Sequence, residues 1–377
     1  MSRAGRALPA AESSVPATPY RIATPAPRVR LSRMALKALG AAPGWAQRLI
    51  GGKSVVIDGQ RLHPEIQLVT RLLNAASGED LADLPVERGR AVLDLEASIF
   101  GGKPRPCDIE SITIPTDDGS VPARLYRPRG TRPAGLVVYF HGGGWVLGSL
   151  DSHDAACSFL AERAEVCVMS VGYRLAPEHP FPAGVNDAVA AFRFAVQHAT
   201  DLGVDPAAIA VAGDSAGGNL AAVVAHTTAR AGEQAPALQV LIVPVTDLST
   251  KHSSYRHFGD GYFLTDKHMD WYKDQYLTDP AQALDPRVSP LLAEDLSGLP
   301  TAYVAVAGFD PLRDEGIAYA QRLRDAGVQT VLRVHTGLIH PFSAALGAGR
   351  ACAEATLEIA TAIRFGLAHA RAGRSPS

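Results

Sequence analysis

A serine flanked by glycines follows a short apolar run near the middle of the chain. Residues 209–218 read IAVAGDSAGG, which predicts a buried strand, a tight turn and the start of a helix. Gly213-x-Ser215-x-Gly217 is the pattern of a nucleophile elbow, in which small residues relieve crowding around a strained turn that carries a serine. We therefore expect Ser215 to be exposed and reactive.

A second glycine-rich turn lies upstream, where the apolar run 136–140 is followed by His141-Gly142-Gly143-Gly144-Trp145. The missing side chains let backbone N–H groups approach a ligand. A serine that attacks an ester carbonyl creates an oxyanion, and donors from this loop and from Ala216, the residue after the serine, would stabilise that charge. The two motifs together predict nucleophilic acyl transfer.

An activated serine also needs a base and an acid that orients the base. Both should follow the serine in the chain, the acid first. The apolar run 303–307 precedes Asp310, which places this aspartate at the carboxyl end of a strand, where active sites of open sheets gather. Asp310 is the predicted acid, although it could also cap a helix that begins at Pro311. Asp314 and Glu315 are alternative acids that would also complement the helix dipole.

The base is predicted near the end of the chain. Residues 330–335 read TVLRVH and predict the last strand, and residues 336–341 are expected to form a loop before the final helix. His340 lies on this loop, and its neutral imidazole would take the proton of Ser215. His335, at the end of the strand, is interpreted as a structural histidine.

The fold must bring the predicted serine, aspartate and histidine to the same edge of a sheet. Short apolar runs separated by helical patterns are typical of a parallel sheet with right-handed crossovers. An antiparallel hairpin around residues 117–119 is expected to open this sheet. The predicted parallel strands are 135–140, 165–171, 208–212, 238–243, 301–307 and 329–334.

Composition divides the chain into unequal parts. Residues 1–30 have few large apolar side chains and predict a mobile leader. Residues 31–104 predict a helical region, since Ile66, Val69 and Leu73 share one helix face. Residues 247–285 are rich in aromatics and are interpreted as a cap over an apolar pocket, with surface helices as the alternative. Residues 105–246 and 286–377 form the predicted core.

The overall composition excludes several classes of partner. A formal charge of −2 over 377 residues gives no sign of a nucleic-acid partner. No signal peptide and no membrane-spanning run is recognised, so a cytoplasmic location is expected; peripheral lipid contact and a homo-oligomer are left open. No metal or organic cofactor is expected, and the cysteines are interpreted as reduced, mostly buried thiols: Cys107, Cys157, Cys167 and Cys352.

Several other polar or aromatic residues have structural interpretations. His153 beside Asp154 could suggest a metal pair, but polar residues are also expected at a helix start. Arg174 and Glu178 are interpreted as the brace of a loop, and His141 as a side chain that orients the glycine loop. Trp145 keeps two interpretations, a wall of the acyl pocket or packing beneath the loop.

The ordered motifs resemble the hormone-sensitive lipase family of α/β-hydrolases, in its bacterial esterase branch with HGGG and GDSAGG sequences. The resemblance covers about residues 105–345 and includes YRLAPE (173–178), SPL (289–291), LP (299–300) and DPLRDEG (310–316). It implies an α/β-hydrolase fold, a mostly parallel central sheet flanked by helices with a helical cap. It also implies the roles of individual residues: Ser215, Asp310 and His340 as the triad, Gly143, Gly144 and Ala216 as oxyanion donors, and His141, Gly142 and Asp214 as supporting motif residues.

One residue departs from the family pattern. Pro341 follows the predicted base where the family usually has glycine, and proline restricts the backbone of the residue before it. The sequence therefore leaves open the orientation of the His340 imidazole, and activity is still expected.

The expected activity is a serine carboxylesterase that hydrolyses short- to medium-chain esters through an acyl-enzyme. One alternative keeps the machinery and changes the substrate, to long-chain acylglycerols or aryl acetamides. A second alternative is a non-catalytic small-molecule-binding protein on the same fold, which the presence of Ser215, Asp310 and His340 argues against.

Overall fold

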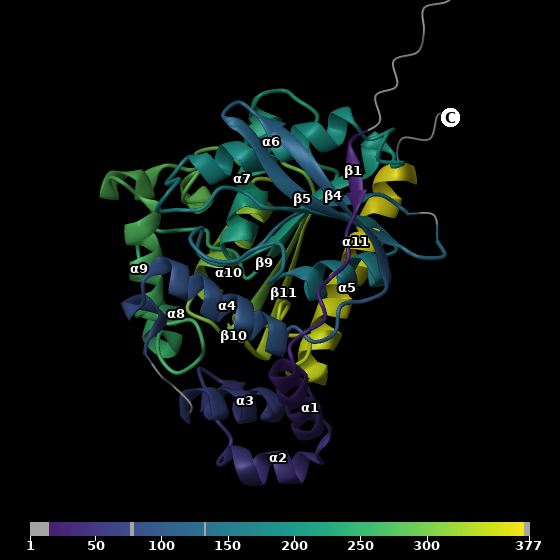
Figure 1. Cartoon of the computed structure of the whole chain (residues 1–377). Helices are drawn as coiled ribbons and strands as arrows, with labels where there is room; N and C mark the ends of the chain where they lie inside the picture. Colours follow the sequence, from purple (N-terminus) through teal and green to yellow (C-terminus); the bar gives the residue numbers. More distant parts are fainter. Residues whose placement is uncertain (1–14, 76–78, 132, 373–377) are drawn as a thin grey trace, which may run out of the picture.

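The structure, a computed structural model, describes residues 15–75, 79–131 and 133–372 of the chain. Its centre is a nine-stranded sheet with the order β1-β4-β5-β7-β6-β8-β9-β10-β11 (Figure 1). The strands from β7 to β11 in this order pair in parallel, and β1, β4 and β5 add an antiparallel edge. The strands are β1 (Ala17–Pro19), β4 (Cys107–Thr116), β5 (Gly119–Pro128), β6 (Leu136–Phe140), β7 (Cys167–Val171), β8 (Ile209–Asp214), β9 (Gln239–Ile242), β10 (Ala302–Phe309) and β11 (Thr330–Ile339).

Helices cover both faces of this sheet, so its central strands are buried on both sides. In β6, Leu136, Val138 and Phe140 pack toward one face, while Val137 and Tyr139 pack toward the other. The first face is covered by α6, α7 and α10, and the second by α5 and α11. These helices are α5 (Asp154–Ala164), α6 (Ala183–Gln197), α7 (Ala216–Arg230), α10 (Arg313–Asp325) and α11 (Arg350–Ala372).

The predicted hairpin and all six predicted parallel strands are confirmed, but the last strand is longer than expected. β11 continues to Ile339, so residues 336–339 belong to the sheet and not to a loop. A register shift between Ala307 and Phe309 of β10 lets Phe309 pair with Ile339. Backbone pairing therefore carries the chain up to His340 itself.

The N-terminal region differs in part from the predicted mobile leader. Residues 1–14 lie outside the described residues, whereas β1 pairs with β4, and α1 begins at Pro27. The open edge of β4 supplies backbone partners to residues 17–19, which the apolar content of this segment does not reveal. A short hairpin, formed by β2 (Val56–Ile57) and β3 (Gln60–Arg61), was not predicted. The helices of this region are α1 (Pro27–Ala41), α2 (Gly44–Gly51), α3 (Pro64–Ala75), η1 (Leu81–Asp83) and α4 (Val86–Phe100).

The aromatic-rich segment 247–285 lies at the side of the molecule next to α4 (Figure 1). It contains α8 (Ser253–Phe258), α9 (Asp266–Tyr276) and η3 (Pro280–Leu284), and a further short helix, η4 (Pro290–Leu292), follows it, while η2 (Pro206–Ala208) precedes β8. Lys267 of α9 forms ion pairs with Asp80 and Asp83 around η1, which joins this segment to the N-terminal helices. No helix among the described residues is long and apolar enough to cross a membrane.

Candidate active site

Ser215 stands at the sharp turn between β8 and α7. Its backbone has φ 58° and ψ −120°, a left-handed conformation that is strained for a non-glycine residue. The turn is tight enough that a Cβ at Gly213 would overlap the backbone of Gly217, and one at Gly217 would overlap the Phe140 carbonyl. These two glycines are therefore required by close backbone approach. The serine is only 9 % exposed, so it is reached through a pocket and is not exposed as the sequence suggested.

Asp310 and His340 meet at the ends of neighbouring strands. His340 Nδ1 lies 2.8 Å from Asp310 Oδ2, and both side chains are buried. The other oxygen of the aspartate, Oδ1, accepts the N–H of Leu312 at 2.9 Å. Helix α10 begins only at Arg313 with Leu312 as its N-cap, so Asp310 is not the cap. Its carboxylate fixes the turn and contacts the imidazole with separate oxygens.

The two alternative acids do not reach His340. Asp314 contacts the neighbouring Arg313 side chain at 2.8 Å. Glu315 is fully buried and accepts the N–H groups of Thr246 and Asp247 at 2.7 and 3.2 Å. Burial raises the pKa of Glu315 well above its ordinary value. Glu315 therefore holds the start of the 247–285 segment, a role that its place in the first helix turn did not reveal.

His335 lies within β11, opposite Ala307 of β10, and not at the strand's end. Its ring contacts Phe342 at 5.0 Å between centroids, and burial lowers the pKa of His335 to about 4. It does not line the pocket that contains Ser215. Its position supports the structural interpretation.

Pro341 is accommodated by a turn that needs no N–H from it. Its carbonyl accepts the N–H groups of Ala344 and Ala345 at 3.0 and 2.9 Å, so it is the first residue of a helical turn. The backbone N–H of Phe342 donates to the carbonyl of Ile339 at 3.2 Å, which closes a turn that contains His340 and Pro341. The proline thus leaves the His340 contact with Asp310 in place.

The glycine loop packs against the elbow through Asp214. Gly143 and Gly144 have φ 115° and 62°, backbone conformations that residues with a Cβ rarely adopt. Glycine therefore allows the orientation of their N–H groups. Asp214 Oδ1 accepts the N–H of Gly142 at 3.2 Å and the hydroxyl of Tyr139 at 2.6 Å. The residue before the serine therefore ties the loop to β6 and β8.

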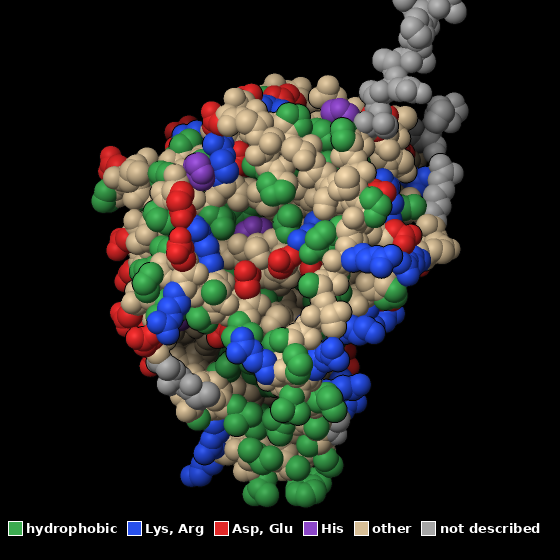
Figure 2. All heavy atoms as spheres, viewed as in Figure 1, with side chains coloured by type: hydrophobic (Ala, Val, Ile, Leu, Met, Phe, Trp, Pro, Cys, Tyr) green, Lys and Arg blue, Asp and Glu red, His purple; other side chains and the backbone are tan. Residues whose placement is uncertain are grey.

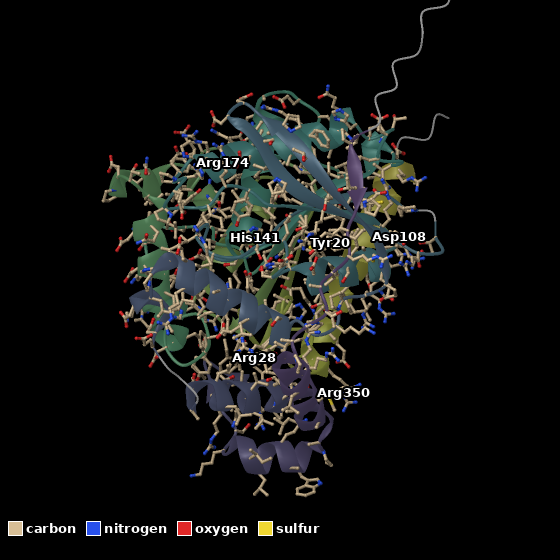
Figure 3. The ribbon with its side chains drawn as sticks, viewed as in Figure 1. Tyr20, Arg28, Asp108, His141, Arg174 and Arg350 are labelled. Atoms are coloured by element: carbon tan, nitrogen blue, oxygen red, sulfur yellow. The ribbon has the colours of Figure 1, made fainter. Side chains whose placement is uncertain are left out.

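Two buried histidines complete this support. His153 Nε2 lies 3.2 Å from Asp214 Oδ2, which is why His153 acts as a partner of Asp214 and neither as a metal ligand nor as a side-chain cap of α5. His141 Nδ1 contacts the Gly142 carbonyl at 2.9 Å, and its ring stacks on Tyr173; it lies in the interior of the molecule (Figure 3). No cluster of metal-ligating side chains occurs among the described residues.

These contacts shift the pKa values of Asp214, His153 and His141 in different directions. Burial would raise the pKa of Asp214, but the neighbouring His153 charge and the hydrogen bonds from His153 and Tyr139 lower it to about 2. Burial also lowers the pKa of His153, yet Asp214 outweighs it and the net shift is upward. His141 has no such partner, and burial lowers its pKa to about 4. The lowered pKa favours the neutral form of His141 at pH 7, which agrees with its interpretation as a side chain that orients the glycine loop.

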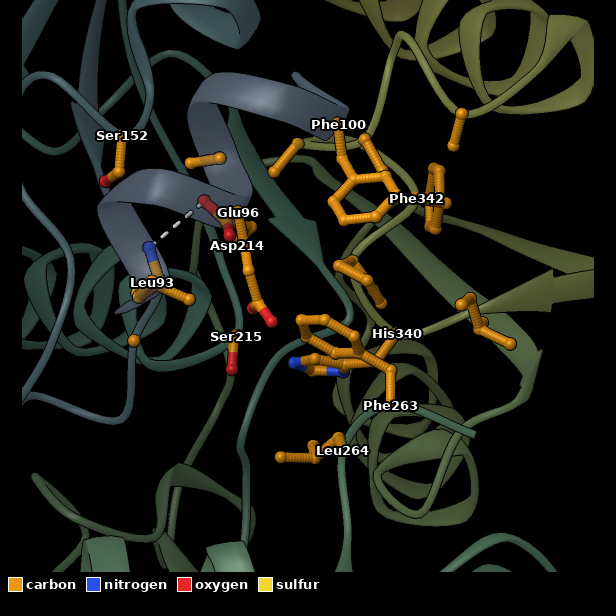
Figure 4. Close-up of a pocket in the computed structure, with 18 of the residues that line it drawn as sticks. Leu93, Glu96, Phe100, Ser152, Asp214, Ser215, Phe263, Leu264, His340 and Phe342 are labelled. Atoms are coloured by element: carbon orange, nitrogen blue, oxygen red, sulfur yellow. Dashed lines mark hydrogen bonds between the residues drawn. The ribbon is translucent and has the colours of Figure 1, made fainter. Parts of the chain in front are cut away.

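Ser215 and His340 open into one pocket whose opposite walls are apolar (Figure 4). Figure 4 shows Glu96 of α4 directed into this pocket near Ser215, with Phe263 and Leu264 on the other side. Burial raises the pKa of Glu96. The apolar lining comes from four parts of the chain: α3 (Ile66, Val69, Leu73), α4 (Leu93, Ala97, Phe100), the 247–285 segment (Phe263, Leu264, Tyr272) and the C-terminal region (Ile339, Phe342, Ala344, Ala345, Ala348, Cys352).

Comparison with known proteins agrees with this geometry. Residues 137–344 match the alpha/beta hydrolase fold family. The chain belongs to this family. LipN of Mycobacterium tuberculosis, named a carboxylic ester hydrolase, is 45 % identical over 340 residues, which cover 88 % of this chain and 90 % of LipN. An ethyl acetate hydrolase of Pseudomonas putida is 43 % identical over 74 % of this chain and 92 % of its own length. The solved esterase of Pyrobaculum calidifontis has a TM-score of 0.77 at 41 % identity and covers 81 % of this chain and 98 % of its own.

Other predicted residues of this alpha/beta hydrolase lie outside the pocket. Trp145 is buried and stacks on Tyr276 at 4.3 Å with the rings almost parallel, so it packs beneath the loop and is no wall of the pocket. Arg174 binds Asp187, and Glu178 binds Arg90 of α4, which agrees with their interpretation as braces. All four cysteines are free and buried, and one of them, Cys352, does line the pocket.

Glu96 is a pocket residue that sequence reasoning missed, whereas Tyr272 belongs to the aromatic segment that was interpreted as a cap over a pocket. Glu96 occurs in the helical pattern DLEASIF of residues 94–100, where a glutamate is a usual surface residue. Tyr272 lies beneath Gly144, where a Cβ would overlap its ring. Neither position carries a local motif, because both enter the site through packing between distant elements.

Proposed function

We propose that this protein is a serine carboxylesterase of the hormone-sensitive lipase branch, with Ser215, Asp310 and His340 as its triad. The alpha/beta hydrolase relatives at 39–45 % identity include proteins named carboxylic ester hydrolase, ethyl acetate hydrolase and arylesterase, and this chain is an enzyme of that class. The observation that carries the proposal is the meeting of His340 Nδ1 with buried Asp310 beside the elbow serine in one pocket.

The contact between His340 and Asp310 supports a sequence of proton transfers. Asp310 occupies Nδ1 of His340, which leaves Nε2 to accept the proton as Ser215 Oγ attacks the ester carbonyl carbon. The carbonyl π electrons move to oxygen. When the tetrahedral intermediate collapses, the C–O bond to the alcohol breaks and His340 returns the proton to the leaving alkoxide. Water then attacks the acyl-enzyme by the same route and releases the acid and free Ser215.

The oxyanion forms where three backbone donors can converge. In this proposal the N–H groups of Gly143, Gly144 and Ala216 stabilise it. Ala216 is the first residue of α7, so its N–H has no partner within the helix and adds the positive end of the helix dipole. Asp214 holds the loop in position through Gly142, so the donors need no reorganisation during the reaction.

The side chains of the pocket walls support the proposed substrate range. Aliphatic and aromatic side chains from α3, α4 and the 247–285 segment suit an acyl chain of short to medium length. These walls form the proposed cap, with residues 31–104 and 247–285 contributing together. A long-chain lipase or an aryl-amide deacetylase would use the same machinery, and turnover across acyl lengths separates them.

The test is Ser215→Ala together with labelling by a small fluorophosphonate. We expect a single adduct on Ser215 in the wild type, no adduct in the variant, and a fall in kcat of at least about 10⁴-fold for p-nitrophenyl butyrate. Ser98→Ala on α4, an exposed serine whose hydroxyl contacts only Leu95, is the matched control and should keep wild-type turnover. Ester hydrolysis retained by Ser215→Ala would refute the assignment, and a folded wild type without adduct or turnover would favour a binding protein.

A further inference from the structure

Six large apolar side chains are exposed on helices α1 and α2 and on the neighbouring strand β2. Trp45 and Leu49, one helix turn apart on α2, are 67 % and 77 % exposed. Figure 2 shows hydrophobic side chains gathered at the lower end of the molecule, over α1 and α2 as placed in Figure 1. We define the α1–α2 face as Leu31, Met34, Trp45, Leu49, Ile50 and Val56, six of the thirteen exposed large apolar side chains in the described part of the chain.

The stretch of sequence that carries this face has charged residues of a single sign. Between Glu12 and Asp58 the sequence contains seven lysines and arginines and no acidic residue. Arg28, which lies on α1 at this end of the molecule (Figure 3), Arg30, Lys37 and Lys53 are exposed, and none of these four pairs with a carboxylate among the described residues. An apolar surface bordered by unpaired cations is typical of helices that lie in the headgroup region of a bilayer.

The helices are held in this arrangement by polar contacts and not by burial of their apolar face. Gln47 of α2 donates to the Gly40 carbonyl of α1 at 3.0 Å. Gln67 of α3 donates to the carbonyls of Gly51 and Lys53 at 2.8 and 2.7 Å and accepts the N–H of Val55 at 3.0 Å. These buried amides fix α2 against α3 while Trp45 and Leu49 face outward.

We propose that the α1–α2 face docks on the surface of bilayers that contain anionic phospholipids. The apolar side chains would enter the headgroup and upper acyl region, and the surrounding cations would contact the phosphates. A second copy of the chain fits less well, because a two-fold interface would place the two sets of cations against each other. Helix α3, which lies between this face and the pocket, contributes Ile66, Val69 and Leu73 to the pocket wall, so docking brings that wall next to the lipid.

The first experiment measures binding of the full chain to vesicles by sedimentation. We expect strong binding to vesicles of phosphatidylcholine and phosphatidylglycerol at low salt, at least about tenfold weaker binding to phosphatidylcholine alone, and release by salt. Trp45→Ser combined with Leu49→Ser should weaken binding at least about tenfold. Phe365→Ser combined with Leu357→Ser, a pair of exposed apolar residues on α11, is the control and should bind as the wild type does.

Charge reversal and fluorescence give independent readouts. Lys37→Glu combined with Lys53→Glu should weaken binding at least about 30-fold, whereas Arg256→Glu combined with Arg324→Glu should leave it unchanged. The emission of Trp45 should shift to shorter wavelength on vesicles. Trp45→Phe should abolish that shift, because Trp145 is buried and the partly buried Trp271 lies on α9, outside the α1–α2 face. Melting followed by circular dichroism reports that each variant is folded.

Three results would overturn the proposal. The first is that the wild type does not bind the anionic vesicles, and the second is that the α11 control variant loses as much vesicle binding as Trp45→Ser with Leu49→Ser. The third is a wild-type dimer that Trp45→Ser with Leu49→Ser converts to a monomer, which would assign the face to a second copy of the chain. Binding does not depend on turnover. Ser215→Ala should therefore bind vesicles as the wild type does, and a failure of the esterase proposal would leave this result unchanged.

Discussion

At the scale of single residues, the two aspartates of the site, Asp214 and Asp310, have different roles. Asp214 and Asp310 each contact a histidine, but Asp214 also accepts from Gly142 and Tyr139, whereas Asp310 contacts the histidine that faces the nucleophile. The first aspartate fixes the glycine loop. The second orients the proposed base.

Asp310→Asn should lower kcat about 10³- to 10⁴-fold, because an amide favours the wrong tautomer of His340. Asp314→Asn, four residues along the same turn and helix, changes a carboxylate that accepts from Arg313 and should keep kcat within about twofold of the wild type. Steady-state hydrolysis of p-nitrophenyl butyrate measures both. The reverse ranking of the two variants would assign the acid to Asp314.

Glu96→Leu should raise kcat/KM for longer acyl chains several-fold and alter short-chain turnover less. The carboxyl group of Glu96 lies in an otherwise apolar wall, and its removal takes away a group that a bound acyl chain must desolvate. The measurement compares p-nitrophenyl acetate with p-nitrophenyl octanoate. Glu87→Leu, at an exposed position of the same helix, is the control, and an equal change in it would contradict the role of Glu96.

At the scale of elements, the glycine loop, β8 and α5 meet at Asp214, and this junction should make stability depend on pH. The pKa of Asp214 is lowered from 3.8 to about 2 in the fold. A lowered carboxyl pKa stabilises the fold above the unfolded value, and this contribution is lost as pH falls through the folded value. The shift corresponds to about 2 kcal/mol.

Asp214→Asn should therefore melt at a lower temperature than the wild type at pH 6, and the difference should shrink between about pH 4 and pH 2. Asp108→Asn removes an exposed carboxylate that pairs with Arg129 and should change the melting temperature little at any pH. Circular dichroism melting across this range is the measurement. A difference that stays constant down to pH 2 would contradict the proposed ionisation.

Helix α4 depends on Arg90 for its position over the pocket. The guanidinium donates to the carbonyls of Val146 and Ala176 at 2.9 and 3.0 Å and binds both oxygens of Glu178. Arg90→Ala should lower the melting temperature by about 2–8 °C and raise KM more than it lowers kcat, because α4 forms a wall of the pocket. Arg88→Ala loses an exposed contact with Glu79 and should change neither the melting temperature nor KM.

At the scale of the whole molecule, one continuous sheet carries the chemistry and three separate segments cover it. β8 supplies the serine, β10 the aspartate and β11 the histidine, so the three side chains emerge at the same edge of the parallel strands. Helices α3 and α4 and the 247–285 segment then close the pocket. The α1–α2 face lies beyond α3, outside the match to the alpha/beta hydrolase family at residues 137–344.

The sequence alone was sufficient to predict the sheet strands, the elbow and the approach of Asp310 to His340, because short apolar runs, glycine-rich turns and chain order are local signals. It did not predict β1, the continuation of β11 or the small β2–β3 hairpin, since each depends on a backbone partner supplied from elsewhere.

Only the tertiary structure decided which polar residues near these motifs belong to the site. Glu315 and His335 are close to the site in sequence, yet packing turns one toward Thr246 and the other against Phe342. Glu96 and Tyr272 are distant from every motif, yet α4 and α9 carry them into the pocket. Sequence patterns determine which side chains can react, whereas the pocket around them is made by packing between segments that carry no such pattern.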